Sequence, residues 1–443
     1  MTFVSDAPKE NFRLGMLIYD TRYRSLTIQV VVLVLFLLFL SWLVNNTIAN
    51  LEAKDRTFDF GFLLNRAGYD INQRLVDYTN DSSHLRAGFI GLLNTLLAAL
   101  VGCTIATVLG VFIGVLRLSK NWLVSRLMTV YVEVFRNVPV LLWILLAATI
   151  LSETAPQPKD FRSTPEMEAA GEAPKASMLF GIIAVTNRGT VIPEPKFCLG
   201  REREACHTES LQPGSPEGGL GVIDLGIFKV SLNLLALLAV FGGSIFVNRR
   251  LVRQANATQE ATGERPVIWW KSLAILTVPS MILLWVLGLH WVVPELKGFN
   301  FVGGINVAHS FTALTLALAL YTAAFIAEIV RAGIQAISRG QSEAAAALGL
   351  RPGRTMNLVI LPQALRVIIP PLISQYLNLT KNTSLAIAVS YMDLRGTLGG
   401  VTLNQTGKEL ECMLLMMGIY LTISLIISAL MNMFNRAVRL KER

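Results

Sequence analysis

The chain of 443 residues is 53% hydrophobic and only 16% charged. Because soluble globular domains are about one quarter charged, this composition disfavours a soluble protein and favours one that contacts lipid. The formal net charge of +9 could indicate nucleic-acid binding, but the positions of the Lys and Arg residues account for it without nucleic acid.

Eight stretches of the sequence are long and apolar enough to be transmembrane helices, which need about 20 mostly apolar residues. The first, TIQVVVLVLFLLFLSWLV from Thr27, has the length of a full span, and no small-residue cleavage site follows it. We therefore expect an anchor and not a cleaved signal peptide, in an all-α integral membrane protein. The predicted spans are residues 27–44, 88–116, 131–151, 228–247, 269–289, 311–330, 367–391 and 412–434.

The distribution of Lys and Arg predicts the orientation of the chain. An even number of spans puts both termini on one side of the membrane, and most Lys and Arg residues outside the spans share that side. By the positive-inside rule this side is the cytoplasm. We expect cytoplasmic termini at 1–26 and 435–443 and long outside loops at 45–87 and 152–227.

The second outside loop is rich in turn-forming residues such as PGSPEGGLG. Its stretch MLFGIIAVTNRGTVIPEP could hold a short helix or strand. The loop is either a variable surface insertion or a docking platform for a soluble partner. Cys198 and Cys206 lie in it and could close a disulfide if the compartment is oxidising, so a bonded and a free pair both remain possible.

Glycines and charged residues mark the second and third spans. Gly110 and Gly114 form a G-x-x-x-G pair, which is typical of close contact between helices. Glu133, Arg136 and Asn137 open the third span, where we expect them near the cytoplasmic face. Snorkelling or a gate salt bridge is favoured there over contact with a substrate.

The sixth span carries polar residues at two levels. Tyr321 and Thr322 lie in the middle of the span, where they either line a pathway or simply pack. Glu328 and Arg331 are three residues apart on one helix face, which predicts a local ion pair.

The loop between the sixth and seventh spans has an unusual composition. SRGQSEAAAALG predicts a short helix, because Ala has the highest intrinsic helix propensity. Ser342 can cap its start, and Gly349 can end it in the left-handed conformation. Small side chains would let another protein approach this helix closely. The Arg residues around it are Arg339, Arg351 and Arg354.

The seventh span contains a charge near its middle. Lys381 at this depth is costly unless it faces a cavity or a partner, so a function is the default hypothesis. Pro370 and Pro371 predict a broken or kinked helix of the kind that lines binding sites. We interpret Lys381 and its neighbours as lining a pathway, with a structural polar network as the alternative. These neighbours are Asn382, Thr383 and Ser384.

The sequence lacks the motifs of ATP hydrolysis and metal binding. A phosphate-cradling loop requires G-x-x-x-x-G-K-[ST], and the nearest stretch, GGVTLNQTGKE, has the wrong spacing. None of the four His residues has a neighbour at ligand spacing, so we predict no metal site. No nucleophile and base pair marks a membrane enzyme either.

The loop before the seventh span resembles the cytoplasmic signature loop of ABC importer permeases. In that pattern E-A-A is followed after three residues by G and nine residues later by I-x-L-P. The matching residues here are Glu343, Ala344, Ala345 and Gly349, then Val359, Ile360, Leu361 and Pro362. Val359 in place of Ile is the one departure. A chance match by an Ala-rich surface helix is the alternative.

Other stretches resemble one subgroup of these permeases. GLLNTLLAALVG, YVEVFRNVPVLL and LNLTKNTSLAIAVSYMDL are similar to polar amino-acid permeases of the histidine/glutamate type. The resemblance implies a five-helix type I ABC importer core within residues 88–434. The extra helix at 27–44 and the insertion at 152–309, with its two spans and outside loop, resemble larger permeases of general or acidic/amide L-amino-acid importers.

The resemblance implies a division of labour in the inner membrane of a bacterium. The permease forms half of a dimer with itself or a paralogue, and a periplasmic binding protein delivers the amino acid. A cytoplasmic ATPase dimer holds ATP and Mg, so this chain needs no cofactor. Its loop at Glu343–Gly349 docks on the ATPase, with Arg339, Arg351 and Arg354 as candidate salt-bridge partners.

Two other functions stay open at this point. An ion-coupled secondary transporter would need no ATPase dock, and would more often show paired halves in its hydropathy. An ABC permease for another solute, such as a sugar or an oxyanion, would share the signature loop.

Overall fold

The computed structural model describes residues 18, 21–53, 58–162, 174–197, 220–224, 229–264 and 266–438. Cys198 and Cys206, the possible disulfide pair, lie outside these residues. The chain divides into two compact units, Met1–Phe62 and Leu63–Arg443. The first unit contains helix α2 (Thr21–Glu52), which extends the predicted span at both ends.

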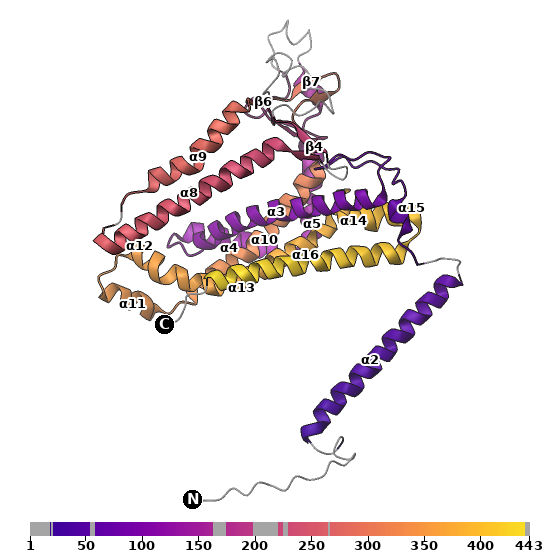
Figure 1. Cartoon of the computed structure of the whole chain (residues 1–443), viewed down its shortest axis with the longest axis horizontal. Coiled ribbons are helices and arrows are strands. Elements are labelled where there is room, and N and C mark those ends of the chain that lie inside the picture. The colour runs from indigo at the N-terminus through magenta and orange to yellow at the C-terminus, as the bar shows by residue number, and fades with distance from the viewer. Residues whose placement is uncertain are drawn as a thin grey trace, which may run out of the picture. The chain divides into compact units, whose positions relative to one another are not determined.

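The second unit is built mainly of long helices (Figure 1). They are α3 (His84–Leu116), α4 (Trp122–Asn137), α5 (Val140–Thr154), α8 (Leu232–Thr262), α9 (Trp269–Val286), α10 (His309–Gln335), α13 (Leu361–Asn382) and α16 (Glu409–Val438). In the described part of the chain, seven helices can cross a membrane by length and composition, and eight if α4 and α5 count as one bent span. The predicted all-α membrane fold is therefore confirmed.

Short elements gather at the two ends of the bundle (Figure 1). The end that carries α11 (Arg339–Ala347) and α12 (Pro352–Thr355) is called the inner end below. The outer end carries the strands, α14 (Leu394–Gly396) and α15 (Leu403–Thr406). Helices α8 and α9 pack against each other and run side by side as a hairpin (Figure 1).

Helices α3 and α10 pack closely because glycines of α3 leave room for the backbone of α10. A Cβ atom added at Gly110 would lie 2.6 Å from Cβ of Ile326 and 3.0 Å from the carbonyl oxygen of Ala323. One added at Gly114 would lie 2.8 Å from the carbonyl oxygen of Ala327. The close contact predicted from the G-x-x-x-G pair is confirmed.

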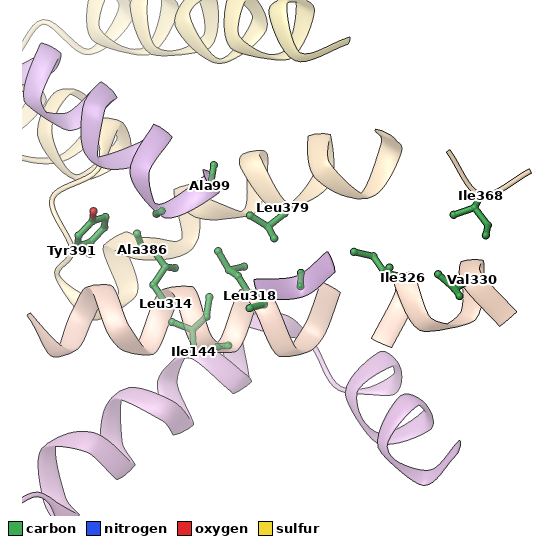
Figure 2. Close-up of a cluster of buried hydrophobic side chains, with 14 of the residues drawn as sticks. Ala99, Ile144, Leu314, Leu318, Ile326, Val330, Ile368, Leu379, Ala386 and Tyr391 are labelled. Atoms are coloured by element: carbon green, nitrogen blue, oxygen red, sulfur yellow. The ribbon is translucent and has the colours of Figure 1, made fainter. Parts of the chain in front are cut away.

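The core of the bundle lies between α10, α13, α5 and α3. Figure 2 shows Leu314 and Leu318 of α10 among Ile144 of α5, Leu379 of α13 and Ala99 of α3, and these side chains are buried. Burying such residues away from water stabilises each by about 1.5 to 3 kcal/mol in a water-facing protein. Within lipid, close packing replaces that driving force.

The third predicted span, 131–151, is wrong as a single straight helix. α4 and α5 meet at an angle of 105°. Pro139 directly precedes the second helix, and Val138 before it has the extended conformation (φ −104°, ψ 134°). Proline lacks an N–H group and disfavours helical geometry in the residue before it, so the chain turns here.

The predicted break of the seventh span at Pro370 and Pro371 is also wrong. α13 runs through both prolines, and its irregular turns lie at its ends. A π-helical turn, η3 (Met356–Ile360), precedes it, and a 3-10 turn, η4 (Thr383–Val389), follows it. Neighbouring helices can compensate the hydrogen bond that a proline removes, which makes proline tolerable within a membrane bundle.

Strands join the two outer segments that flank α8 and α9. β2 (Gly189–Ile192) pairs with β1 (Ala184–Thr186) and β9 (Ile305–Val307), and β3 (Glu194–Phe197) pairs with β6 (Leu289–Val292). Two further antiparallel pairs are formed by β4 (Val222–Asp224) with β5 (Lys229–Ser231) and by β7 (Glu295–Lys297) with β8 (Asn300–Val302). Short 3-10 turns are η1 (Gly61–Leu64) and η2 (Pro158–Phe161). The stretch expected to hold a helix or strand thus holds strands.

Candidate functional site

The Ala-rich stretch forms helix α11, a helix of nine residues at the inner end of the bundle. The helix begins after Ser338, whose backbone is extended and whose side chain makes no capping hydrogen bond. The prediction that Ser342 caps its start is therefore wrong, since Ser342 lies inside the helix. Gly340 tolerates a helical conformation, so the helix starts earlier than the Ala run suggests.

The end of α11 has the geometry predicted for Gly349. This residue has φ +75°, in the left-handed region. Its N–H donates to the carbonyl of Ala346 at 2.9 Å, and the N–H of Leu350 donates to the carbonyl of Ala345 at 3.1 Å. These two bonds form a Schellman motif, the usual glycine-dependent stop of a helix.

One face of α11 is attached to the bundle and the other is free. Ala345 is buried, whereas Glu343 and Ala344 are exposed. Gln363 of α13 donates a hydrogen bond to Gln341 at 3.3 Å, which ties the helix to its own chain. Of the predicted coupling residues, Ala345 anchors the helix, and most of the others offer their side chains to solvent.

The three arginines around α11 are all exposed. Arg339 is its first residue, and Arg351 and Arg354 lie on the turn that follows. The backbone carbonyl of Arg351 accepts hydrogen bonds from the N–H groups of Arg354 and Thr355 at 2.9 and 3.0 Å. The positions of these arginines are therefore fixed by backbone geometry, and their side chains are available to a partner.

The second half of the signature pattern forms an irregular turn. The N–H of Leu361 donates to the carbonyl of Met356, five residues earlier, which defines a π turn. Pro362 lies in the first turn of α13, where its missing N–H costs no helical hydrogen bond. The V-I-L-P stretch thus connects α12 to α13 and sets the direction in which α11 projects.

A cluster of three charges joins α3 to α10 near the inner end. Arg331 Nη2 lies 2.8 Å from Glu328 Oε1, so the predicted ion pair is present. Glu328 also accepts a hydrogen bond from Arg117, the residue that ends α3. The Arg117 side chain is only 7% exposed, so the pair is well shielded from solvent. Arg117 was not predicted, because nothing in the sequence links it to a residue more than 200 positions away.

Glu133, Arg136 and Asn137 lie together next to the bend between α4 and α5. They end α4, and the Arg136 guanidinium lies 5.3 Å from the ring centre of Phe325, in the middle part of α10. Asn137 donates a hydrogen bond to Glu133 at 3.4 Å. All three are exposed in the single chain. The sequence did not reveal the α4–α5 bend that follows them directly.

The predicted pathway residues on α13 and η4 separate into two groups. Lys381 is exposed, and no described carboxylate forms an ion pair with it. Ser384 donates to the carbonyl of Lys381 at 2.8 Å, and Asn382 is half-buried. Thr383 is fully buried and donates to the carbonyl of Thr380 at 2.7 Å. Lys381 therefore reaches the surface, whereas Thr383 belongs to the core.

The candidates on α10 separate in the same way. Thr322 is buried in the bundle. Tyr321 is half-buried, and its ring centre lies 5.0 Å from that of Phe325, the ring that Arg136 covers. Tyr321 is thus the member of the pair that lies near the charged end of α4.

A buried polar centre at the outer end was missed by the sequence reasoning. Asp393 is fully buried, accepts a hydrogen bond from the N–H of Gly396 at 2.7 Å, and accepts another from the hydroxyl of Tyr420 at 3.2 Å. Burial raises the pKa of this carboxyl to about 6, and the hydrogen bonds oppose the rise. Asp393 holds the segment Leu394–Gly396 against the bundle.

The α3 side of this centre contributes further hydrogen bonds, although the buried Oδ1 of Asn94 has no hydrogen-bond partner. Asn94 is buried and donates to the carbonyls of Gln73 and Met392 at 2.8 and 2.9 Å. Thr95 accepts a hydrogen bond from the N–H of Leu394 at 3.0 Å. Asn94 and Thr95 are adjacent polar residues in the otherwise apolar stretch GLLNTLLAALVG. This polar pair is the feature of the sequence that could have predicted the buried polar centre.

Comparisons with known families and proteins agree with these features. Residues 268–440 match the family model described as binding-protein-dependent transport system inner membrane component. This range includes α11, the π turn, Lys381 and Asp393.

Three curated proteins are similar over nearly the whole chain. The glutamate/glutamine/aspartate/asparagine transport system permease protein BztB of Rhodobacter capsulatus is 64% identical over 445 residues, covering 100% of both chains. The general L-amino acid transport system permease protein AapQ of Rhizobium johnstonii is 40% identical, covering 98% of this chain and 96% of its own length. The putative amino-acid ABC transporter permease protein YhdX of Escherichia coli is 39% identical, covering 95% of each.

Proposed function

The chain belongs to the family of binding-protein-dependent transport system inner membrane components and is a permease subunit of an amino-acid ABC transporter, and we propose that it imports acidic amino acids and their amides. The similarity to a permease of glutamate, glutamine, aspartate and asparagine transport, which extends over the full length of both chains, supports this substrate class. The nearly full-length similarity to a general L-amino-acid permease makes a broader range the second candidate.

The proposed ATPase contact is the exposed face of α11. A helix whose one side is anchored by Ala345 and whose other side is free can transmit a push or pull to α13. Glu343 and Ala344 lie on the free side, and the Schellman turn at Gly349 fixes where the helix ends. Arg339, Arg351 and Arg354 would pair with carboxylates of the ATPase, and ATP with Mg would bind on that partner.

A second permease is proposed to cover the charged end of α4. Glu133 and Arg136 are both exposed, although Arg136 lies beside Phe325 in the middle part of α10. Charges at such a depth are costly in lipid unless they face a partner or a water-filled cavity. At the dimer interface, a second, related permease or a second copy of this one would supply a protein partner and a water-filled cavity for these charges.

Lys381 is the proposed contact for the substrate carboxylate. It is exposed near the end of α13 and has no ion pair with a described carboxylate. An amino acid that passes along this face would supply the missing negative charge. Ser384 and Asn382 offer hydroxyl and amide groups beside it, and Tyr321 is the proposed pathway residue on α10.

The orientation proposed for the complex follows from the Lys and Arg distribution. Both termini and α11 would lie in the cytoplasm, in the inner membrane of a bacterium. The strands would then lie outside, where a binding protein releases its amino acid. β2 pairs with β9 and the imidazole of His309, the first residue of α10, forms a hydrogen bond with the carbonyl of Thr186, so this outer region is joined to the core.

An uptake measurement tests this proposal. The chain is co-expressed with its ATPase, binding protein and second permease, and uptake of labelled L-glutamate, L-glutamine and L-leucine is measured in proteoliposomes. We expect ATP-dependent uptake of the first two in excess of L-leucine. Equal uptake of all three amino acids would favour a general amino-acid transporter. Uptake of none of them would refute the proposal that the substrates are amino acids.

A further inference from the structure

Few residues of the α8–α9 hairpin are buried in the single chain. α9 has no buried residue, and its 18 residues correspond to about 27 Å, close to the thickness of a bilayer core. The apolar part of α8 ends at Val247, after which the helix continues with Asn248 and Arg249. We therefore place one boundary of the apolar layer after Val247 of α8 and at Trp269, the first residue of α9.

One hydrogen bond fixes this boundary level on both helices. The hydroxyl of Ser272 on α9 donates to the side-chain oxygen of Asn248 on α8. Arg249 follows Asn248 directly, and Lys271 precedes Ser272 directly. The two helices thus bring their first cations to the same depth, where lipid headgroups lie.

Four exposed cations surround the junction. They are Arg249, Arg250, Arg253 and Lys271. None of them forms an ion pair with a described carboxylate. The first described carboxylate along α8 is Glu260, about 18 Å beyond Asn248, which exceeds the screening length of about 8 Å at physiological salt.

Aromatic side chains mark the same level. Trp269 and Trp270, which begin α9, are 69% and 54% exposed, as expected of indoles at a membrane interface. The Arg250 guanidinium lies 4.5 Å from the ring centre of Phe246, and the Lys271 ammonium lies 5.4 Å from that of Trp270. The rings hold these cations at the interface while leaving their donors free.

We propose that this junction binds the phosphodiester group of an anionic phospholipid. The acyl chains would lie along the exposed apolar faces of α8 and α9, and the phosphate would lie between Arg249, Arg250 and Lys271. Charge complementarity favours an anionic over a zwitterionic lipid, at about fivefold in affinity for each cation near the surface. The site needs only a headgroup layer at this level, so it stands whether or not the proposed substrate class is correct.

Native mass spectrometry of the intact transporter tests the site. The complex is purified in a mild detergent and equilibrated with phosphatidylglycerol, cardiolipin or phosphatidylcholine. The double variant Arg249→Gln/Arg250→Gln is compared with a matched variant, Lys120→Gln/Arg126→Gln, which removes two exposed cations from the turn between α3 and α4 and from α4.

We expect the wild-type complex to retain phosphatidylglycerol or cardiolipin on the order of tenfold more than the junction variant does, with no such loss in the matched variant. Retention of one anionic lipid above the other identifies the source of the phosphodiester. Equal loss in both variants, or equal retention of phosphatidylcholine, overturns the proposal. Loss of a protein subunit from the junction variant would also overturn it, because the cations would then belong to a protein interface.

Discussion

Replacement of Gly349 tests whether the geometry at the end of α11 matters for coupling. Gly349 has φ +75°, and a Cβ atom added there would meet nothing within 4 Å. A substitution at this position therefore costs backbone strain and creates no clash within the chain. For Ala in the left-handed region the strain is about 1 to 2 kcal/mol, whereas Asn adopts this region more readily.

This strain is large for α11, which has only nine residues. Helices shorter than about 12 residues are marginal on their own, so a loss of 1 to 2 kcal/mol reduces the population of the native helix end about 5- to 30-fold. We expect stimulation of the partner ATPase by loaded binding protein to decrease in the order wild type, Gly349→Asn, Gly349→Ala, Gly349→Val. Membrane insertion should not change.

Gly340 provides the matched control, because it lies in the same helix with negative φ and open space around it. Gly340→Ala should leave coupling unchanged or improve it, since Ala favours a helix over Gly by about 1 kcal/mol. The assay is ATP hydrolysis by the reconstituted complex, with pull-down of the ATPase as a second measurement. Equal loss for Asn, Ala and Val would refute the argument from backbone strain and would indicate a steric contact with the partner.

Four further outcomes follow from the structure. Gly110→Ala should separate α3 from α10 at a cost of about 1 to 3 kcal/mol and so lower the melting temperature of the complex. Gly418→Ala is the control and should have no effect, because a Cβ atom added at Gly418 would meet nothing within 4 Å. Differential scanning fluorimetry measures both melting temperatures. Lys381→Met should reduce uptake severalfold while the complex still assembles, and loss of assembly would instead assign the lysine a structural role. The folded-state pKa of Asp393 is raised to about 6, so the wild-type chain should gain thermal stability relative to Asp393→Asn as the pH falls from about 7.5 to about 5. A loss of relative stability over the same pH range would contradict the burial of this carboxyl group. A cysteine at Ser342 should react with a membrane-impermeant reagent only from the cytoplasm, and labelling from outside would reverse the topology.

Local patterns in the sequence predicted the parts of the fold that depend on near neighbours. The apolar runs, the G-x-x-x-G pair and the glycine stop of α11 each depend on residues within one or two turns of each other. The ion pair of Glu328 with Arg331 is of the same kind. Such features are visible in the sequence because helix geometry fixes the spacing of their residues.

Features that depend on distant contacts were not predicted. Glu328 also holds Arg117 on another helix, and Asp393 holds Tyr420. The sharp bend at Pro139, between α4 and α5, was missed, whereas a break was wrongly expected at Pro370, which lies inside the continuous helix α13. Whether a proline bends a helix depends on how its neighbours compensate the lost hydrogen bond, and a single sequence does not contain that information.

The most direct test of the central claim is the energy source of amino-acid uptake. The complete complex is reconstituted in proteoliposomes with labelled L-glutamate outside and with either ATP inside or a sodium or proton gradient across the membrane. We predict uptake that requires internal ATP and is abolished by Gly349→Val. Uptake driven by an ion gradient without ATP, at the same rate in this variant, would contradict the assignment of this chain as the permease of an ATP-driven importer.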